Sequence, residues 1–235
     1  MDAAENGLLA ALSQNELKRL RRKLELVDLA CGQVLYESVR PLKCAYFLTT
    51  ATVALHFPLE QRTSVKIALV GSEGLIGIPL FFGGMATQGC AIVQCPGQAF
   101  RLNAQAVAGE VDAASPLLQL VLRYAHTLIA LLMQTAACQR HHSFEQHLCR
   151  WLLLTQDRLG DDDIAISQEQ IAQKLGVRRE SVTEAAARLR SDGLIRSARG
   201  HIILLDRPGI EQRACECYAR GKTDIDRLLP RRHAR

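Results

Sequence analysis

The sequence predicts an α+β fold with three parts in order: an antiparallel β domain, a long helix, and a mainly helical C-terminal domain that includes a β-hairpin. Three observations predict this order. Short runs of β-forming residues alternate with turn residues between residues 32 and 107. The hydrophobic period becomes helical from Ser115. Two short helical segments and a hairpin pattern then follow between residues 167 and 205.

The N-terminal third begins with a helical pattern at residues 8–28, in which Ser13 and Glu16 have the spacing of a capping box. Prolines and glycines then separate six candidate strands, which predicts turns between them. The candidate strands are residues 32–36, 44–57, 64–70, 75–82, 90–94 and 98–102. We expect an antiparallel sandwich or barrel of about 75 residues.

The long helix is predicted to start with Ser115 as its N-cap and Pro116 as its first residue. Apolar residues in it repeat with alternating spacings of four and three, the pattern of a two-stranded coiled coil. We therefore predict a dimer interface formed by Leu117, Val121, Tyr124, Leu128, Leu131, Thr135 and Cys138. The opposite face of the helix is apolar too, so we expect one face to pack against the β domain and the other against a second protomer. The alternative is a core helix within one protomer.

A hinge is predicted at residues 139–142, and Ser143 and Gln146 then open an amphipathic helix that runs to Gly160. Ser167 and Gln170 repeat the capping pattern at a short helix, and Gly176 supplies the tight turn before the next one. Two short helices joined by such a turn are typical of a helix-turn-helix.

The second of these helices presents polar side chains, and a β-hairpin with a turn at Arg199-Gly200 follows it as a wing. In the major groove, arginine can form two hydrogen bonds with guanine, and glutamate can accept a hydrogen bond from the amino group of cytosine. Basic residues on a wing can contact the DNA phosphates. The predicted DNA contacts are Ser167, Gln168, Arg178, Arg179, Glu180, Ser181, Thr183, Glu184, Arg196, Arg199 and His201.

The charge distribution favours the same partner. Residues 164–235 hold 15 lysines and arginines against nine acidic residues, whereas the preceding residues are close to neutral. Residues 128–133 are the longest apolar run and are too short to span a bilayer, and residues 1–12 lack the basic start of a secretory signal. We expect a cytoplasmic protein without a membrane partner. No catalytic constellation is found, so we expect no enzyme.

The stretch from Val177 to Thr183 is similar to the Arg-Glu-Thr/Ser-Val run that opens the recognition helix of the cyclic-AMP receptor / fumarate-nitrate regulator (CRP/FNR) family. The resemblance covers nearly the whole chain. It implies a cyclic-nucleotide-binding-like β-roll at residues 1–114, a dimerisation helix and hinge at 115–142, and a winged helix-turn-helix at 143–235. It also implies that Arg179 and Glu180 contact bases. Glu184 stands where the family often has arginine, so the target site should differ.

The resemblance further implies an effector pocket in the β-roll, which we place at Gly77, Ile78, Thr87, Gln88 and Tyr124. Cyclic-nucleotide binders of the family have a glutamate for the ribose and an arginine for the phosphate. This chain has Ile78 and then Thr87-Gln88 at those places, so canonical cyclic AMP binding is not expected. The effector and any cofactor stay unknown.

Cysteines and histidines gather near the hinge, including Cys138, His141, His142, His147 and Cys149. Their spacing does not favour a shared metal, and Cys215 and Cys217 would point apart on a helix. We expect buried thiols, surface imidazoles and no metal site.

The leading hypothesis is thus an effector-controlled, homodimeric transcriptional regulator that binds double-stranded DNA, with RNA polymerase as a further candidate partner. The alternatives are a ligand-independent or architectural DNA-binding protein, and a redox or haem sensor of the same fold.

Overall fold

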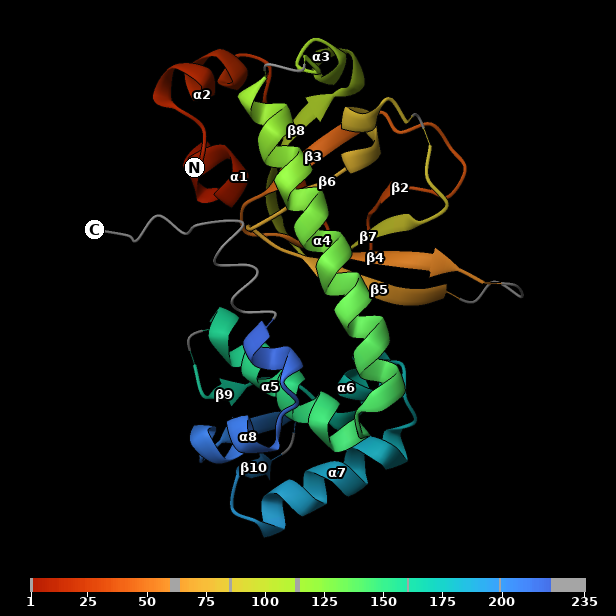
Figure 1. Cartoon of the computed structure of the whole chain (residues 1–235), viewed down its shortest axis with the longest axis vertical. Coiled ribbons are helices and arrows are strands. Elements are labelled where there is room, and N and C mark those ends of the chain that lie inside the picture. The colour runs from red at the N-terminus through yellow and green to blue at the C-terminus, as the bar shows by residue number, and fades with distance from the viewer. Residues whose placement is uncertain are drawn as a thin grey trace. The chain divides into compact units, whose positions relative to one another are not determined.

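The computed structural model describes residues 2–59, 64–84, 86–112, 115–159, 161–198 and 200–220 (Figure 1). The chain divides after Ala130 into two compact units, here called the N-terminal unit and the C-terminal unit. This division falls inside the long helix α4 (Pro116–His141), between the boundaries predicted at residues 114 and 142. The predicted α+β order is confirmed.

The N-terminal unit is a β-roll of two four-stranded antiparallel sheets. The first sheet has the order β1 (Glu25–Leu29), β8 (Gly97–Asn103), β3 (Cys44–Leu48) and β6 (Leu75–Ile76). The second has the order β2 (Val34–Tyr36), β7 (Cys90–Cys95), β4 (Thr52–Pro58) and β5 (Ser64–Val70). Both sheets contribute to one core, in which Phe47, Val53 and Val93 are fully buried. This burial of alternate strand residues is the main source of the unit's stability.

Three details of this unit differ from the predicted pattern. The run at residues 44–57 forms two strands, because the chain turns at Thr49–Ala51, where three backbone amides donate to the carbonyl of Gln98. The run at 75–82 is a two-residue strand followed by the 3-10 helix η3 (Ile78–Phe82). Strand β1 and helix α3 (Ala104–Ala108) were not predicted, and β1 occupies the end of the segment that began with a helical pattern.

Two short helices, α1 (Gly7–Ala10) and α2 (Gln14–Arg21), precede the β-roll. The capping box of Ser13 and Glu16 is confirmed at α2. Asn6, which is fully buried, caps α1 through its Oδ1, which accepts from the amides of Leu8 and Leu9. Its Nδ2 donates to the carbonyls of Leu48 and Gly74 at 2.9 and 2.8 Å. The one side chain therefore joins the N-terminal helix to the end of β3 and to the loop before β6.

Helix α4 begins with the predicted cap, since the amide of Leu118 donates to Oγ of Ser115 at 3.4 Å. It is longer than predicted and is apolar enough, by length and hydropathy, to cross a bilayer, so the prediction that no segment resembles a membrane span was wrong. A core helix passes the same test. Leu117, Val121 and Tyr124 pack into the core of the β-roll, which explains one apolar stripe without a bilayer.

The C-terminal unit contains helices, among them the end of α4 and a helical stretch at residues 217–220, and a three-stranded antiparallel sheet. In chain order the labelled elements are the end of α4, α5 (Phe144–Leu159), β9 (Asp163–Ile164), α6 (Gln168–Leu175), α7 (Arg179–Ser191), β10 (Ile195–Ala198), β11 (His201–Leu204) and α8 (Arg207–Arg213). The sheet order is β10-β11-β9, so Asp163 and Ile164, which follow α5, supply an edge strand. Helix α8 ends at Arg213, because Ala214 has extended backbone angles, and the chain is helical again at residues 217–220.

Candidate nucleic-acid interface

Helices α6 and α7 form a helix-turn-helix whose geometry follows from local sequence. Oγ of Ser167 accepts from the amide of Gln170, and Oε1 of Gln170 accepts from the amide of Ser167, which completes the predicted capping box. Gly176 ends α6 at a φ of 67°, a left-handed conformation that favours glycine. Four fully buried side chains of α7 fasten its inner face to the core, namely Val182, Ala185, Ala186 and Leu189.

The outer face of α7 is polar and open to solvent, as the sequence predicts. Arg178, Arg179, Glu180, Thr183 and Glu184 are all exposed, and they come from the cap and the first two turns of the helix. The predicted contacts Ser167, Gln168 and Ser181 are half-buried. The structure therefore places these predicted residues on and around one accessible helix start, where side chains of a recognition helix enter the major groove.

Two contacts position residues on this face. Oγ1 of Thr183 donates to Oε1 of Gln168 at 2.9 Å, which joins the exposed ends of α6 and α7. Nε of Arg179 lies 4.0 Å from Oε2 of Glu169, a long ion pair between two exposed groups. Such a pair contributes about 0–1 kcal/mol, so the guanidinium is free to exchange this partner for a base or a phosphate.

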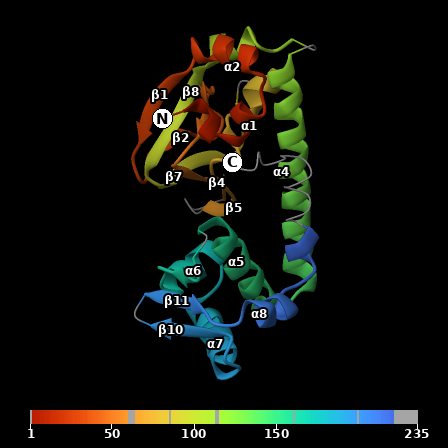
Figure 2. The ribbon, with the colours of Figure 1, turned by 90° about the vertical axis from the view of Figure 1, so that its left-hand side faces the viewer.

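The wing consists of β10 and β11, and α7 packs beside β10 (Figure 2). Arg196 on β10 is exposed and makes no ion pair with any residue in the described ranges. His201 is also exposed, but its Nδ1 lies 2.9 Å from Oδ1 of Asp163, so the imidazole already has an acidic neighbour. Arg199 lies outside the described residues, as does the basic end at residues 231–235.

Glu145 supports this surface and was not singled out in the sequence. Its carboxylate, largely buried, accepts from Nε of Arg188 at 2.6 Å and from a guanidinium nitrogen of Arg213 at 3.0 Å. Arg213 also contacts Asp192 at 2.7 Å. The Arg188 guanidinium, followed by that of Arg213, holds the pKa of Glu145 below its usual range. These pairs join α5, α7 and α8, and no local pattern in the sequence indicates them.

Comparison with known proteins agrees with this geometry. Residues 146–213 match the model of the Crp-like helix-turn-helix domain. A protein assigned to the CRP/FNR family of transcriptional regulators from Eubacterium rectale has a similar structure, with a TM-score of 0.71 and 15% identity over 89% of this chain and 98% of that one. A CRP/FNR-family regulator from Thermus thermophilus aligns with a TM-score of 0.66 and 23% identity over 81% and 98% of the two chains.

The chain has the fold of a CRP/FNR regulator. FixK2 from Bradyrhizobium japonicum shares it too, with a TM-score of 0.66 and 15% identity over 82% of this chain and 98% of FixK2. The resemblance predicted from the sequence is confirmed for the fold and, over residues 146–213, for the domain type. The matched domain and these structures belong to transcriptional regulators rather than enzymes. A search of curated proteins finds no match.

In this CRP/FNR fold, a pocket of about 310 Å³ in the β-roll contains three of the five predicted effector residues. Its lining includes Gly77, Ile78 and Thr87, together with Tyr36, Leu55, Leu75, Ile76, Pro79, Phe82 and Gly84. No charged residue is among the described residues that line it. Burial, with a smaller effect of Cys90, raises the pKa of Tyr36 to about 12, so this phenol stays neutral at physiological pH.

The other two predicted effector residues lie elsewhere. Gln88 is exposed, and its carbonyl accepts from Oγ of Ser38 at 2.8 Å. Tyr124 is buried in the core, and its hydroxyl lies so close to Gly74 that a Cβ at that glycine would clash with it. Burial raises the pKa of Tyr124. Tyr124 therefore fastens α4 to the loop before β6 and does not line the pocket.

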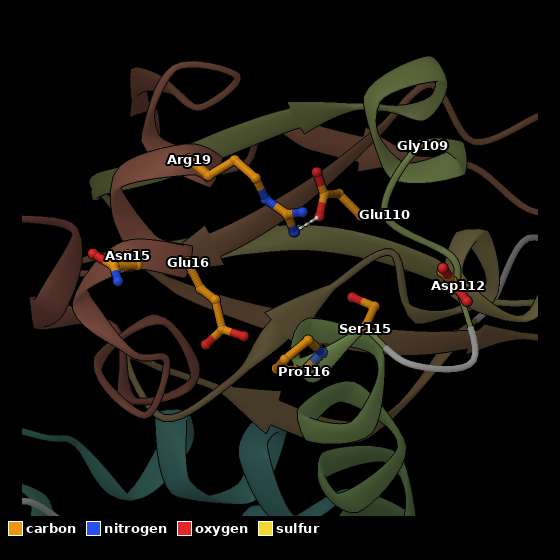
Figure 3. A pocket seen from close by; sticks show the side chains of 8 residues that line it. All are labelled: Asn15, Glu16, Arg19, Gly109, Glu110, Asp112, Ser115 and Pro116. Atoms are coloured by element: carbon orange, nitrogen blue, oxygen red, sulfur yellow. Dashed lines mark hydrogen bonds and ion pairs between the residues drawn. The ribbon is translucent and has the colours of Figure 1, made fainter.

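A second pocket, of about 370 Å³, lies between α2 and the start of α4 (Figure 3). Figure 3 shows Arg19 pointing toward Glu110, whose carboxylate is 3% exposed. The carboxylate binds Arg19 and Lys23, both at 2.7 Å. Because two cations already neutralise the one buried acid, this pocket is best explained as a structural ion-pair site.

The predicted dimer interface on α4 needs a correction. Leu117, Val121 and Tyr124 are 0–4% exposed inside the β-roll, and Cys138 is buried among other thiols in the C-terminal unit. Leu128, Leu131 and Thr135 are half-buried. Leu117, Val121, Tyr124 and Cys138 are therefore taken up by the cores of their own units, because a helix with two apolar stripes gives no sign in its sequence of which one faces its own core, whereas Leu128, Leu131 and Thr135 stay predicted interface residues. The outward stripe contains Leu122, Ile129 and Met133, all exposed.

Proposed function

We propose that the chain is a sequence-specific transcriptional regulator that binds duplex DNA as a homodimer, under the control of a small effector in the β-roll. The observation that carries this proposal is the exposed start of α7, where two arginines, two glutamates and a threonine project from a helix whose other side is fully packed. A helix built only to pack has no need of this set, whereas base edges in the major groove offer partners for each of these side chains.

The homodimer is supported by the outward stripe of α4. Leu122, Ile129 and Met133 are 48%, 55% and 68% exposed, and they repeat with spacings of seven and four along one helix face. His126 and Ala136 complete the four-three repeat of a coiled-coil seam. A second copy of the same helix would bury this stripe and would supply two recognition helices to a near-palindromic site. We favour this partner over a bilayer, since a DNA-binding protein works in the cytoplasm.

Effector control is supported by the β-roll pocket. Its lining is mostly apolar, with the hydroxyls of Tyr36 and Thr87 as polar groups. A cyclic phosphate would lack a cationic partner among the described lining residues, and a charged group without one is costly to bury. We infer that the effector is a small, uncharged and mainly apolar molecule, and that canonical cyclic AMP binding does not occur there.

Selection of bound duplexes from a random library tests the DNA proposal. We expect an enriched, near-palindromic site with half-sites about 10 base pairs apart or a multiple of this. Binding to the selected site should be at least about 1,000-fold tighter than binding to an unrelated duplex at the same salt concentration. Equal binding to both duplexes would favour an architectural DNA-binding protein, and a visible haem spectrum of the purified protein would favour the sensor alternative.

A further inference from the structure

Four soft ligands meet in the C-terminal unit, where the end of α4 contacts the segment that follows α8. They are Cys138, His142, Cys215 and Cys217, and their ligand atoms all lie within 4.8 Å of one another. Sγ of Cys138 lies 3.5 Å from Sγ of Cys215 and 3.4 Å from Nδ1 of His142. Nδ1 of His142 is also 3.8 Å from Sγ of Cys217. We propose that this cluster binds one zinc ion.

The local backbone explains why four distant residues converge. Cys138 and His142 are four residues apart at the end of α4, where the amide of His142 still donates to the carbonyl of Cys138, so both side chains share one helix face. Cys215 and Cys217 do not diverge as expected on one helix, because Cys215 lies in the break after α8, where Ala214 is extended, and the next helical stretch starts only at Cys217. The expectation of no metal site overlooked both the four-residue spacing and this break.

The distances fit a single tetrahedral ion. Around Zn²⁺, with bonds of about 2.3 Å to sulfur and 2.0 Å to nitrogen, tetrahedral ligands lie about 3.3–3.8 Å from one another. Three of the six ligand separations, 3.4, 3.5 and 3.8 Å, match this spacing, and all six are within 4.8 Å. Three cysteines and one histidine are a common ligand set of structural zinc sites. Such soft ligands select against calcium and magnesium, which prefer oxygen.

Neighbouring groups support the ligands in the way zinc sites require. Nε2 of His142, the ring nitrogen that faces away from the thiols, lies 3.3 Å from a carboxylate oxygen of Glu216. A carboxylate at that position orients a metal-bound imidazole with Nδ1 toward the ion. Nε of Arg150 is buried and has no acceptor within the described part of the chain. Three thiolates on Zn²⁺ carry a net negative charge, and the guanidinium of Arg150 would offset it.

The site would join the C-terminal segment to the junction of α4 and α5. Two hydrogen bonds already hold the same backbone: Nε2 of Gln134 donates to the carbonyl of Cys217 at 3.0 Å, and Nε2 of His147 lies 2.8 Å from the carbonyl of Cys138. With four protein ligands the ion has no open position, so its role is structural rather than catalytic. The inference does not depend on DNA binding.

Metal analysis of the full-length protein, purified without chelator and under reducing conditions, tests the proposal. We expect about one zinc per chain, and Co²⁺ in its place should give the intense visible bands of a tetrahedral thiolate site. Chelation should lower Tm, because the ion binds the folded state, and added Zn²⁺ should restore it. Cys217→Ser should lose about 100-fold or more in affinity, whereas Cys95→Ser, at an exposed thiol of the N-terminal unit, should bind like the wild type.

Glu216→Gln tests the positioning role of the carboxylate. It should weaken zinc binding by about 10- to 100-fold and keep the tetrahedral cobalt spectrum, because all four ligands stay. The proposal is overturned if the wild-type protein, folded by circular dichroism, takes up neither ion, or if Cys95→Ser abolishes binding. A Cys138–Cys215 disulfide in protein that was purified under reducing conditions would also overturn it. Metal uptake by the wild-type protein and the state of its thiols decide the proposal even if Cys217→Ser does not fold.

Discussion

Glu145 on α5 accepts a hydrogen bond of 2.6 Å from Nε of Arg188 on the recognition helix α7. The same carboxylate binds Arg213 on α8 at 3.0 Å. Replacing it by glutamine, which keeps the shape and removes the charge, should lower the free energy of unfolding of the C-terminal unit by about 1–2 kcal/mol, since two charge-assisted bonds weaken. Urea unfolding monitored through Trp151 measures this loss, with the exposed Glu211→Gln as the control.

The same residue gives a pH dependence with a definite sign. Arg188, followed by Arg213, lowers the pKa of Glu145 in the folded state. The stabilisation is therefore fully present above the carboxyl's unfolded pKa of about 4.3 and is lost as the pH falls through the lower, folded value. Stability measured from pH 7 to pH 3 should fall more steeply for the wild type than for Glu145→Gln. If the stability of the two proteins falls equally with pH, Glu145 is not the group responsible.

Arg179→Ala and Arg196→Ala should have different effects on DNA binding. Arg179 is at the start of α7, so its loss should lower the affinity for the selected site by about 10- to 100-fold. It should also relax the base preference at one base pair of each half-site. Arg196 is on the wing, so its loss should weaken all duplexes alike and reduce the salt dependence of binding. Titrations on the selected and an unrelated duplex at several salt concentrations separate the two. If Arg179→Ala lowers the affinity for both duplexes equally, Arg179 does not contact a base.

Ile129→Glu combined with Leu122→Glu should convert the proposed homodimer to a monomer. Both side chains lie on the exposed stripe of α4, and two charges per copy on a coiled-coil seam would face the same charges in the partner. Sedimentation equilibrium measures the mass, and circular dichroism checks the fold. Val65→Glu is a matched control, because Val65 is as exposed as Leu122 but lies on β5. A dimer that persists in the double variant would move the interface off this stripe.

Asn6→Ala should destabilise the N-terminal unit by about 2–4 kcal/mol, because the buried amide makes four hydrogen bonds. Its loss leaves the carbonyls of Leu48 and Gly74 without this donor in a dry environment. Thermal unfolding compared with Asn15→Ala, an exposed asparagine of α2, measures the effect. Equal Tm values for the two variants would show that the cap is dispensable.

Local signals predicted most of this fold. The three capping boxes at Ser13, Ser143 and Ser167 and the left-handed turn at Gly176 depend on contacts within a few residues, and the structure contains all of them. The exposed face of α7 was predictable from local sequence as well. Once the buried positions are known, the 3.6-residue period of a helix determines which side chains face solvent.

The features that sequence reasoning missed depend on long-range contacts. Strand β1 pairs with β8, more than 60 residues away, and nothing local distinguishes its alternation from the end of a helix. Leu117, Val121, Tyr124 and Cys138 of α4 were assigned to a second protomer although they are buried in their own units, because both stripes of the helix are apolar. The thiol cluster combines residues from both ends of the C-terminal unit, so only the folded chain shows it.

Strand β9 contributes only Asp163 and Ile164, yet it pairs with Ile203 and Ile202 of the wing strand β11. A shortened polypeptide that starts at Ser167 would retain both helices of the helix-turn-helix and the hairpin but would leave that side of β11 unpaired. Free backbone amides beside isoleucines invite edge-to-edge association. Such a fragment should aggregate, whereas one that starts at Ser143 should stay dispersed.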